Sequence, residues 1–322
     1  MIRHFLADDD LSPDEQAQVL ALALKLKADP YAYQPFAGPR CVAVMFDKPT
    51  LRTQSSFAAG IAELGGYPMI VDARLAGIGE RESVADTARV LGRQSVAIVW
   101  RTFAQSSLAE MAAFSGVPTV NALTDSYHPC QILADLLTVQ ERLGRLAGID
   151  FAYVGDGANN MAHSYLLGGA TAGLNVRIGA PVGFHPDPEV LDRARAIATR
   201  TGGSITVTDS VTDAVAGARV VATDTWVSMG QEAGGRESVF VPYAVTAALL
   251  ARAAPDAVFL HCLPAYRGKE VAAEVVDGPQ SAVWDEAENR RHVQKAVLAF
   301  LDAASRGATA ELISVVDHRG HW

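Results

Sequence analysis

The sequence has few cysteines, no excess of positive charge and no long hydrophobic run, and each shortage excludes a class of protein. Its three cysteines, Cys41, Cys130 and Cys262, are odd in number and far apart, so they give no disulfide framework and favour a reducing compartment. Acidic residues outnumber basic ones by 36 to 27, and the net charge of −9 argues against a nucleic-acid or membrane-surface partner. No apolar run reaches the roughly 18 residues of a membrane span. The first residues, MIRH followed by Asp8–Asp10, do not resemble a signal peptide, and we expect a cytoplasmic protein.

What is present is typical of a globular α/β protein. The length of 322 residues favours two domains of about 150 residues each. Short apolar runs alternate with segments of helical periodicity, which predicts two α/β domains, each a doubly wound parallel sheet, facing across an active-site cleft. The expected strands are 41–46, 68–72, 96–100, 118–121, 151–154, 176–178, 205–207, 220–222 and 258–260. The expected helices begin with a capping box at Ser12–Glu15 and continue with 52–64, 82–92, 106–114, 129–143 and a last helix to about 304.

The segment 47–54 (DKPTLRTQ) lies between the expected strand 41–46 and the helix that follows it. A helix N-terminus after a short turn offers free backbone N–H groups and a positive dipole end to an anion. Thr50 and Thr53 add hydroxyl groups, and Arg52 adds a planar fork of donors that suits phosphate oxygens. The alternative interpretation is a Thr N-cap beside an exposed arginine.

Polar side chains recur where the expected strands end, and in open parallel sheets ligands bind outside these carboxyl ends. Cations and hydroxyls in the first half suit a phosphorylated anion, whereas Asn160, Asp224 and Ser228 suit the amine and carboxylate of an amino acid. The residues at strand ends are Arg52, Arg101, His128, Asn160, Asp224, Cys262 and Arg290.

Three other functions would draw on the same residues, and the sequence favours none of them. The run 155–160 (GDGANN) partly imitates a dinucleotide fingerprint, but it lacks the third glycine, and no acid ends the next strand. The pairs His128/Cys130 and His261/Cys262 do not match a zinc spacing. Cys262 as a covalent nucleophile would need a positioned base, and His261 would point the other way on a strand.

Five motifs together resemble the ornithine branch of the aspartate/ornithine transcarbamylase family over about residues 1–304. They are Thr50–Thr53, His128–Gln131 (HPCQ), Asp224–Gly230 (DTWVSMG), His261–Pro264 (HCLP) and Glu288–Arg290 (ENR). The resemblance implies transfer of the carbamoyl group from carbamoyl phosphate to the δ-amine of L-ornithine, giving L-citrulline and phosphate. It also implies no metal or organic cofactor and a catalytic homotrimer, or a multiple of trimers.

The resemblance further implies a division of the chain and of the site. Residues 1–145, completed by a C-terminal helix at 289–304, would bind carbamoyl phosphate, and 146–288 would bind ornithine, with the tail 305–322 unassigned. The implied catalytic residues are Arg52, Arg101, His128, Asp224, Cys262 and Arg290. The implied substrate-binding residues are Thr50, Leu51, Thr53, Gln131, Asn160, Ser228, Met229 and Leu263.

The chain departs from the family pattern at four positions. Thr50, which keeps a hydroxyl, and Leu51 and Gln54 replace residues of the family's Ser-Thr-Arg-Thr-Arg loop. Gly77 stands about where ornithine enzymes carry a Gln that reaches into the neighbouring subunit. We therefore keep two alternatives: a carbamoyltransferase-like paralogue with a different amine or donor, and a non-catalytic regulatory relative. Weaker binding of carbamoyl phosphate is expected from the same departures.

Overall fold

The computed structural model describes residues 2–227, 236–309 and 312, and the chain divides into two compact units. The first unit comprises Met1–Ala134 and Glu288–Trp322, and the second comprises Asp135–Ala287. Both division points fall inside helices, namely α6 (Pro129–Leu143) and α13 (Val283–Arg306). Each unit contains one parallel sheet, which confirms the predicted class of two parallel-sheet α/β domains.

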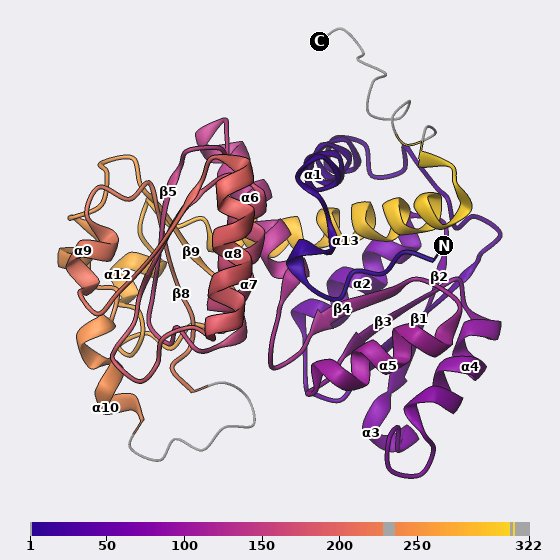
Figure 1. Cartoon of the computed structure of the whole chain (residues 1–322). Coiled ribbons are helices and arrows are strands. Elements are labelled where there is room, and N and C mark those ends of the chain that lie inside the picture. The colour runs from indigo at the N-terminus through magenta and orange to yellow at the C-terminus, as the bar shows by residue number, and fades with distance from the viewer. Residues whose placement is uncertain (1, 228–235, 310–311, 313–322) are drawn as a thin grey trace, which may run out of the picture. The chain divides into compact units, whose positions relative to one another are not determined.

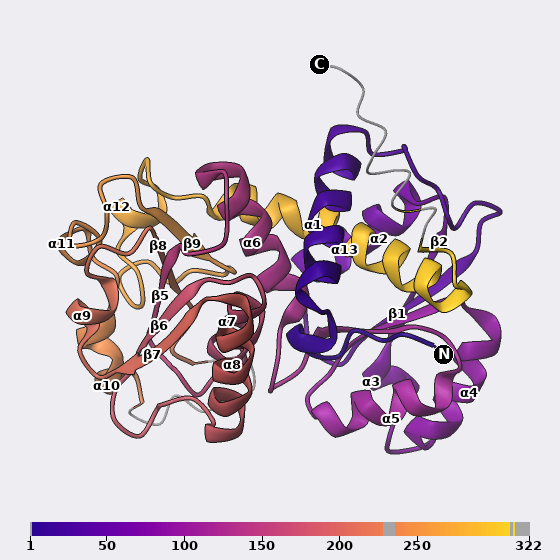
Figure 2. The same ribbon diagram turned by 45° about the horizontal axis from the view of Figure 1, so that its top comes forward.

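The first unit is built on a four-stranded sheet in the order β2-β1-β3-β4, and every pairing is parallel. Its strands are β1 (Cys41–Phe46), β2 (Tyr67–Asp72), β3 (Ala97–Arg101) and β4 (Thr119–Leu123). Its other elements are η1 (Asp8–Asp10), α1 (Pro13–Ala28), α2 (Arg52–Glu63), α3 (Ala73–Ala76), α4 (Val84–Gln94) and α5 (Gln105–Ser115). Figures 1 and 2 show α4 and α5 on one face of this sheet and α1, α2 and the later part of α13 on the other.

Apolar packing holds the helices on one face of this sheet, and the bonds of a buried lysine help to hold those on the other. Met45, Ile98 and Trp100 point from the strands into a cluster with Leu108 and Met111 of α5. On the other face, Lys295 of α13 is fully buried, and its Nζ donates to the Leu26 carbonyl at the end of α1 and to Glu63 of α2. These bonds fix α13 to the helices of the first unit.

The second unit is built on a five-stranded parallel sheet in the order β7-β6-β5-β8-β9. Its strands are β5 (Asp150–Val154), β6 (Asn175–Gly179), β7 (Ser204–Thr208), β8 (Val220–Thr223) and β9 (Val258–His261). Its other elements are α7 (Asn160–Thr171), α8 (Pro188–Thr201), α9 (Val211–Val215), α10 (Glu237–Phe240), η2 (Val241–Tyr243), α11 (Ala247–Leu250) and α12 (Ala273–Val276).

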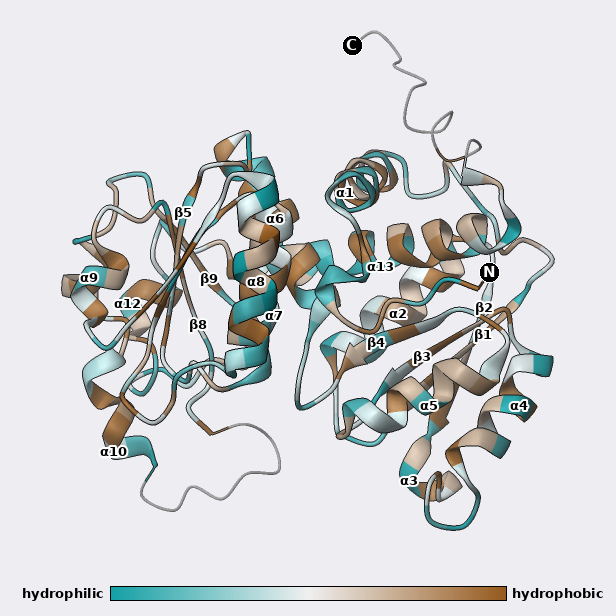
Figure 3. Cartoon of the chain, viewed as in Figure 1, coloured by the Kyte–Doolittle hydropathy of each residue, from teal (hydrophilic) through white to brown (hydrophobic). Residues whose placement is uncertain are grey.

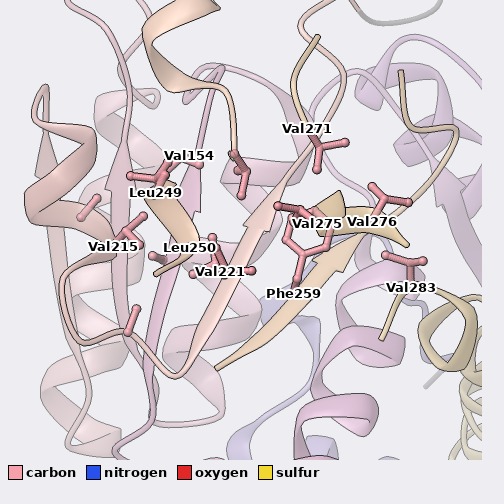
Figure 4. Packing of buried hydrophobic residues seen from close by; sticks show 14 residues of the cluster. Val154, Val215, Val221, Leu249, Leu250, Phe259, Val271, Val275, Val276 and Val283 are labelled. Atoms are coloured by element: carbon pink, nitrogen blue, oxygen red, sulfur yellow. The ribbon is translucent and has the colours of Figure 1, made fainter. Parts of the chain in front are cut away.

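The core of the second unit lies between the sheet and its short helices (Figure 4). Val154, Val221 and Phe259 from three strands meet Leu249 of α11 and Val275 of α12. Figure 3 shows α8 banded in hydrophobic and hydrophilic residues, as expected for a helix with one buried face on the surface of a domain.

The strand orders locate the point where each sheet reverses its winding. In the first unit the chain moves outward from β1 to β2 and then returns to β3, so the reversal lies between β1 and β3. In the second unit the corresponding point lies between β5 and β8. Because ligands of doubly wound sheets bind at the carboxyl edge beside such a reversal, the residues that follow β1, β3, β5 and β8 are the first candidates for a site.

Among the described residues, no helix combines the length and apolarity that crossing a membrane requires.

Candidate functional site

The turn between β1 and α2 presents one hydroxyl and one arginine at a helix start. Thr50 and Arg52 are half-buried, while Thr53 is buried within the first turn of α2. Leu51 is the N-cap residue and makes no side-chain cap, and its side chain is 76% exposed. The alternative interpretation of Thr50 as an N-cap beside an exposed arginine is therefore wrong.

The Thr53 hydroxyl is the meeting point of two arginines. Its oxygen accepts a hydrogen bond from Arg101 Nη1 and another from Arg290 Nη2, each at 3.2 Å. Arg290 Nη1 also donates to Gln131 Oε1 at 2.5 Å, and all four side chains are buried. Arg101 ends β3 as predicted, but the prediction that Arg290 follows a strand is wrong, because it lies about two turns inside α13.

His128 lies at the start of α6, where its carbonyl accepts from Gln131 N–H. Burial, followed by the positive charges of Arg290, Arg101 and Arg52, holds the pKa of His128 well below its usual range. The ring is therefore neutral near neutral pH, and it can donate one hydrogen bond without adding charge. Arg52, Arg101 and Arg290 thus form one cationic cluster with Thr53, His128 and Gln131, and the exposed side chain of Leu51 does not belong to it.

Lys48 belongs to the same region, although the sequence reasoning gave it no role. Its side chain is 6% exposed, its Nζ lies 2.5 Å from Asp125 Oδ1, and it stands 4.4 Å from the centre of the Phe103 ring. It thereby connects the loops that follow β1, β3 and β4. The available signal was a lysine two residues after the apolar run 41–46.

In the second unit, Asp224 and Cys262 lie side by side. β8 and β9 are parallel, and Thr223 at the end of β8 lies opposite His261 at the end of β9. The residues that follow them, Asp224 and Cys262, therefore lie next to each other. Cys262 Sγ donates to Asp224 Oδ1 at 3.2 Å. Burial, then the charges of Asp224 and Glu286, raises the pKa of the Cys262 thiol well above its usual value, so the thiol stays protonated and is a poor nucleophile.

Asp224 itself is 7% exposed. Burial raises the pKa of Asp224, and the nearby His261 and the Cys262 hydrogen bond oppose that rise. A carboxylate in such a place can accept a proton more readily than one in water.

The remaining predicted residues of this unit surround the same strand ends or lie outside the described residues. Asn160 is the first residue of α7 and half-buried, and its neighbour Asn159 caps that helix by accepting from Ala162 N–H. Leu263 directly follows Cys262. Ser228 and Met229 lie outside the described residues.

His261 differs from the sequence-based expectation. β9 ends at His261, so Cys262 is no longer part of the strand, and the two side chains need not point to opposite faces. One potential ligand atom from each of Asp224, His261 and Cys262 lies within 4.8 Å of the other two. Both ring nitrogens of His261 are already hydrogen-bonded, one to Leu263 N–H and the other to Glu270. A metal ion bound by this group would have to displace one of these bonds. Nothing in the sequence marked Glu270.

A pocket of ≈ 330 Å³ opens at the other end of the second sheet. It is lined by residues at the amino ends of β8 and β9, including Arg219 and Val258, and by Arg142 of α6. Its arginines are paired with acids, Arg142 with Asp285 and Arg219 with Asp256. The pocket is therefore separate from the predicted residues, which lie at the carboxyl ends.

The chemistry of the two groups differs. The cluster in the first unit offers guanidinium, hydroxyl, amide and neutral imidazole groups, a set suited to a phosphate and a polarised carbonyl. The group in the second unit offers a carboxylate and a protonated thiol, which suit an amine.

The comparisons with known proteins cover almost the whole chain. The family described as aspartate/ornithine carbamoyltransferase matches with its carbamoyl-P binding domain at residues 3–141 and with its Asp/Orn binding domain at residues 147–301. Ornithine carbamoyltransferase from Renibacterium salmoninarum is 61% identical over 94% of this chain and 99% of its own length. The structure of ornithine carbamoyltransferase from Pyrococcus furiosus is 40% identical with a TM-score of 0.89, covering 92% of this chain and 96% of that one. An acetylornithine transcarbamylase complexed with acetylcitrulline is 29% identical with a TM-score of 0.85, covering 93% and 99%.

Proposed function

Because the chain belongs to the aspartate/ornithine carbamoyltransferase family, we propose that it is an ornithine carbamoyltransferase. It transfers the carbamoyl group from carbamoyl phosphate to the δ-amine of L-ornithine, giving L-citrulline and phosphate. The observation that carries this proposal is the Thr53 hydroxyl held between Arg101 and Arg290 beside a neutral His128. Ornithine carbamoyltransferases that are 61% and 60% identical to this chain support the same reaction.

The first unit would bind the donor. Thr50, Thr53, Arg52 and Arg101 hold the phosphate, and the backbone N–H groups at the start of α2 add to them. Arg290 and His128 polarise the carbonyl of the carbamoyl group, and Arg52 reaches it as well as the phosphate. Gln131 holds the carbamoyl amide. These donors aim at the oxygen on which negative charge develops, so they stabilise the tetrahedral intermediate more than the bound substrate.

The second unit would bind the acceptor. Asn160, Ser228, Met229 and Leu263 hold the α-amino acid end, while Asp224 and Cys262 face the δ-amine. The amine must lose its ammonium proton before it attacks, and Asp224 takes that proton because burial raises its pKa. The lone pair of the amine then forms the C–N bond. Collapse of the intermediate breaks the bond to the phosphate oxygen, and the departing phosphate takes the second proton from the attacking nitrogen.

A domain assignment follows from these roles. We assign 1–145 with the helix 289–304 to carbamoyl phosphate and 146–288 to ornithine. The compact unit that includes Glu288 onward with residues 1–134 supports the return of the last helix to the donor half.

We also propose a cytoplasmic homotrimer. The edge strand β2 and helix α3 expose large apolar side chains, namely Tyr67 at 58%, Ile70 at 41% and Leu75 at 82%. An uncovered edge strand with such residues favours association with another chain. Three free cysteines fit a reducing compartment. Light scattering after gel filtration should give three times the chain mass or a multiple of it, and a monomer would refute this part.

The test of the function is product formation with competing acceptors. Purified enzyme should form citrulline from carbamoyl phosphate and L-ornithine with a far higher kcat/KM than it shows with N-acetyl-L-ornithine, L-aspartate or putrescine. An Arg290→Ala protein, purified in parallel, controls for contaminating host enzyme. Preference for acetylornithine would establish a different acceptor. Binding of carbamoyl phosphate without turnover of any amine would establish a non-catalytic relative.

A further inference from the structure

The segment that carries Cys262 and Leu263 adopts an unfavourable backbone conformation. Among the residues that the structure describes, Leu263 is the only non-glycine residue with a positive φ, at 58°. A side chain at such a φ crowds the following carbonyl, so the conformation persists only where surrounding bonds hold it. Leu263 directly follows the cysteine assigned to the δ-amine, which makes these bonds relevant to the reaction.

The bonds come from a buried histidine and a buried glutamate. Leu263 N–H donates to His261 Nδ1 at 2.9 Å, so Nδ1 carries no proton and Nε2 carries it. His261 Nε2 then donates to Glu270 Oε1 at 3.2 Å, and the same oxygen accepts Tyr266 N–H at 2.6 Å. His261 is fully buried and Glu270 is 1% exposed, so neither bond competes with water.

A second anchor fixes the backbone on the strand side. His261 N–H donates to the fully buried Glu286 Oε2 at 2.9 Å. The turn after β9 is therefore held at His261 by its backbone and at Leu263 by the His261 ring. Between these two points lies Cys262, whose Sγ reaches Asp224 Oδ1 at 3.2 Å.

We propose that His261 is a positioning residue, which, anchored on Glu270, fixes the Cys262–Leu263 backbone so that the Cys262 thiol meets Asp224. This inference rests on the proposed function for its consequence, because the Asp224–Cys262 pair is assigned to the acceptor amine. His261 acts through its neighbours and does not touch the reacting atoms.

Two substitutions separate the two bonds of the ring. Asn places its Oδ1 near the position of Nδ1 and can accept Leu263 N–H in an Asx-type turn, but it does not reach Glu270. Gln places its amide N–H near Nε2 and can donate to Glu270, but it loses the Leu263 bond. His261→Gln should therefore lower kcat on the order of 10²-fold, the size expected when a reacting group moves by about 1 Å. His261→Asn should keep kcat within about fivefold of wild type, because it retains the bond that shapes the turn.

The KM values and the thiol give readouts that a general loss of packing would not produce. In His261→Gln the KM for carbamoyl phosphate should stay unchanged, because the donor residues lie in the other unit. Alkylation of Cys262 by iodoacetamide, followed by mass spectrometry of its peptide, should become at least about fivefold faster, since a thiol released from Asp224 ionises more readily. Lys269→Gln is the matched control: it changes an exposed residue of the same loop, paired with Glu237, and should leave every value unchanged.

Two results would overturn the proposal. The first is equal loss of kcat in the Asn and Gln variants, accompanied by parallel losses of thermal stability. The second is wild-type alkylation and wild-type kcat in His261→Gln. If the wild-type protein forms no citrulline at all, the proposed function fails by itself, and the alkylation rates still decide whether His261 positions Cys262.

Discussion

Replacing Thr53 with valine removes one oxygen from the centre of the cationic cluster and leaves the side-chain volume almost unchanged. That oxygen accepts from Arg101 and from Arg290 at 3.2 Å each, so its own proton is free to point at a third group. In the proposed complex this group is a phosphate oxygen. In Thr53→Val, two buried guanidinium groups therefore lose a hydrogen-bond acceptor, and the bound phosphate loses a hydrogen-bond donor.

The magnitude follows from hydrogen bonds to charged groups, which contribute about 1.5–3 kcal/mol each. The loss of one such bond to the phosphate should raise the KM for carbamoyl phosphate by roughly 10- to 100-fold. The unliganded variant should also unfold more easily by about 1.5–3 kcal/mol, because two charged donors lose a partner in a buried place. Bound carbamoyl phosphate supplies acceptors to both arginines, so saturating ligand should recover part of that stability.

The assay is steady-state citrulline formation with each substrate varied in turn, together with urea unfolding with and without donor. Thr53→Ser is the matched control, because it keeps the hydroxyl and removes only a methyl group. The KM for ornithine should stay within about twofold of wild type, since none of the residues predicted to bind ornithine belongs to the first unit. A KM for carbamoyl phosphate that is unchanged in a folded Thr53→Val protein would refute the assignment of this cluster to the donor.

Further predictions concern Arg52, Asp224, the departures Gln54 and Gly77, and the buried His292. Arg52→Ala should lower kcat by roughly 10²-fold, as for a lost oxyanion donor, and a folded variant with normal kcat would contradict the role given to the α2 start. Asp224→Asn should keep carbamoyl phosphate binding by calorimetry but weaken capture of ornithine, and the reverse pattern would overturn the division between units. Gln54→Arg should tighten binding of carbamoyl phosphate by less than about fivefold, the limit for an exposed charge. Gly77→Gln should lower the free energy of unfolding by about 1 kcal/mol, because Gly77 has a φ of +67°. Burial and the charges of Lys295 and Arg291 lower the pKa of His292 from 6.5 to about 4, so the folded state binds fewer protons in that window. Stability should therefore fall as the pH drops from 6.5 toward 4, and His292→Gln should reduce the fall in denaturant midpoints.

The strands were predictable because their sequences are short, apolar and bounded by polar turns. The predicted strand 41–46 is β1 residue for residue, and the other predicted strands fall within a residue or two of β2–β9. β9 was predicted to end at residue 260, yet it continues to His261. A histidine in a sequence is typical of the start of a loop, and its burial here is favourable because its ring bonds both Glu270 and Leu263 N–H.

The sequence predicted which residues belong to the site better than it predicted which of them form hydrogen bonds with one another. Alternation of strands and helices places Arg52 and Arg101 at the same sheet edge, because parallel strands share their carboxyl ends. No such rule applies to Arg290, which enters from a helix and reaches Thr53 across 237 positions of sequence. Its membership was predicted from the family resemblance and from the wrong expectation that it follows a strand.

The two departures at the start of α2, Leu51 and Gln54, lie on its exposed side. Leu51 and Gln54 are three residues apart at the start of α2, so they share one face, and both are exposed. Thr53 is buried between two arginines, and Arg52 is half-buried. The chain has therefore changed the outward face of the loop and kept the donors that turn inward. Such a distribution favours retained donor chemistry with altered contacts outside the cluster, because a loop rebuilt for another ligand would have changed the buried positions first.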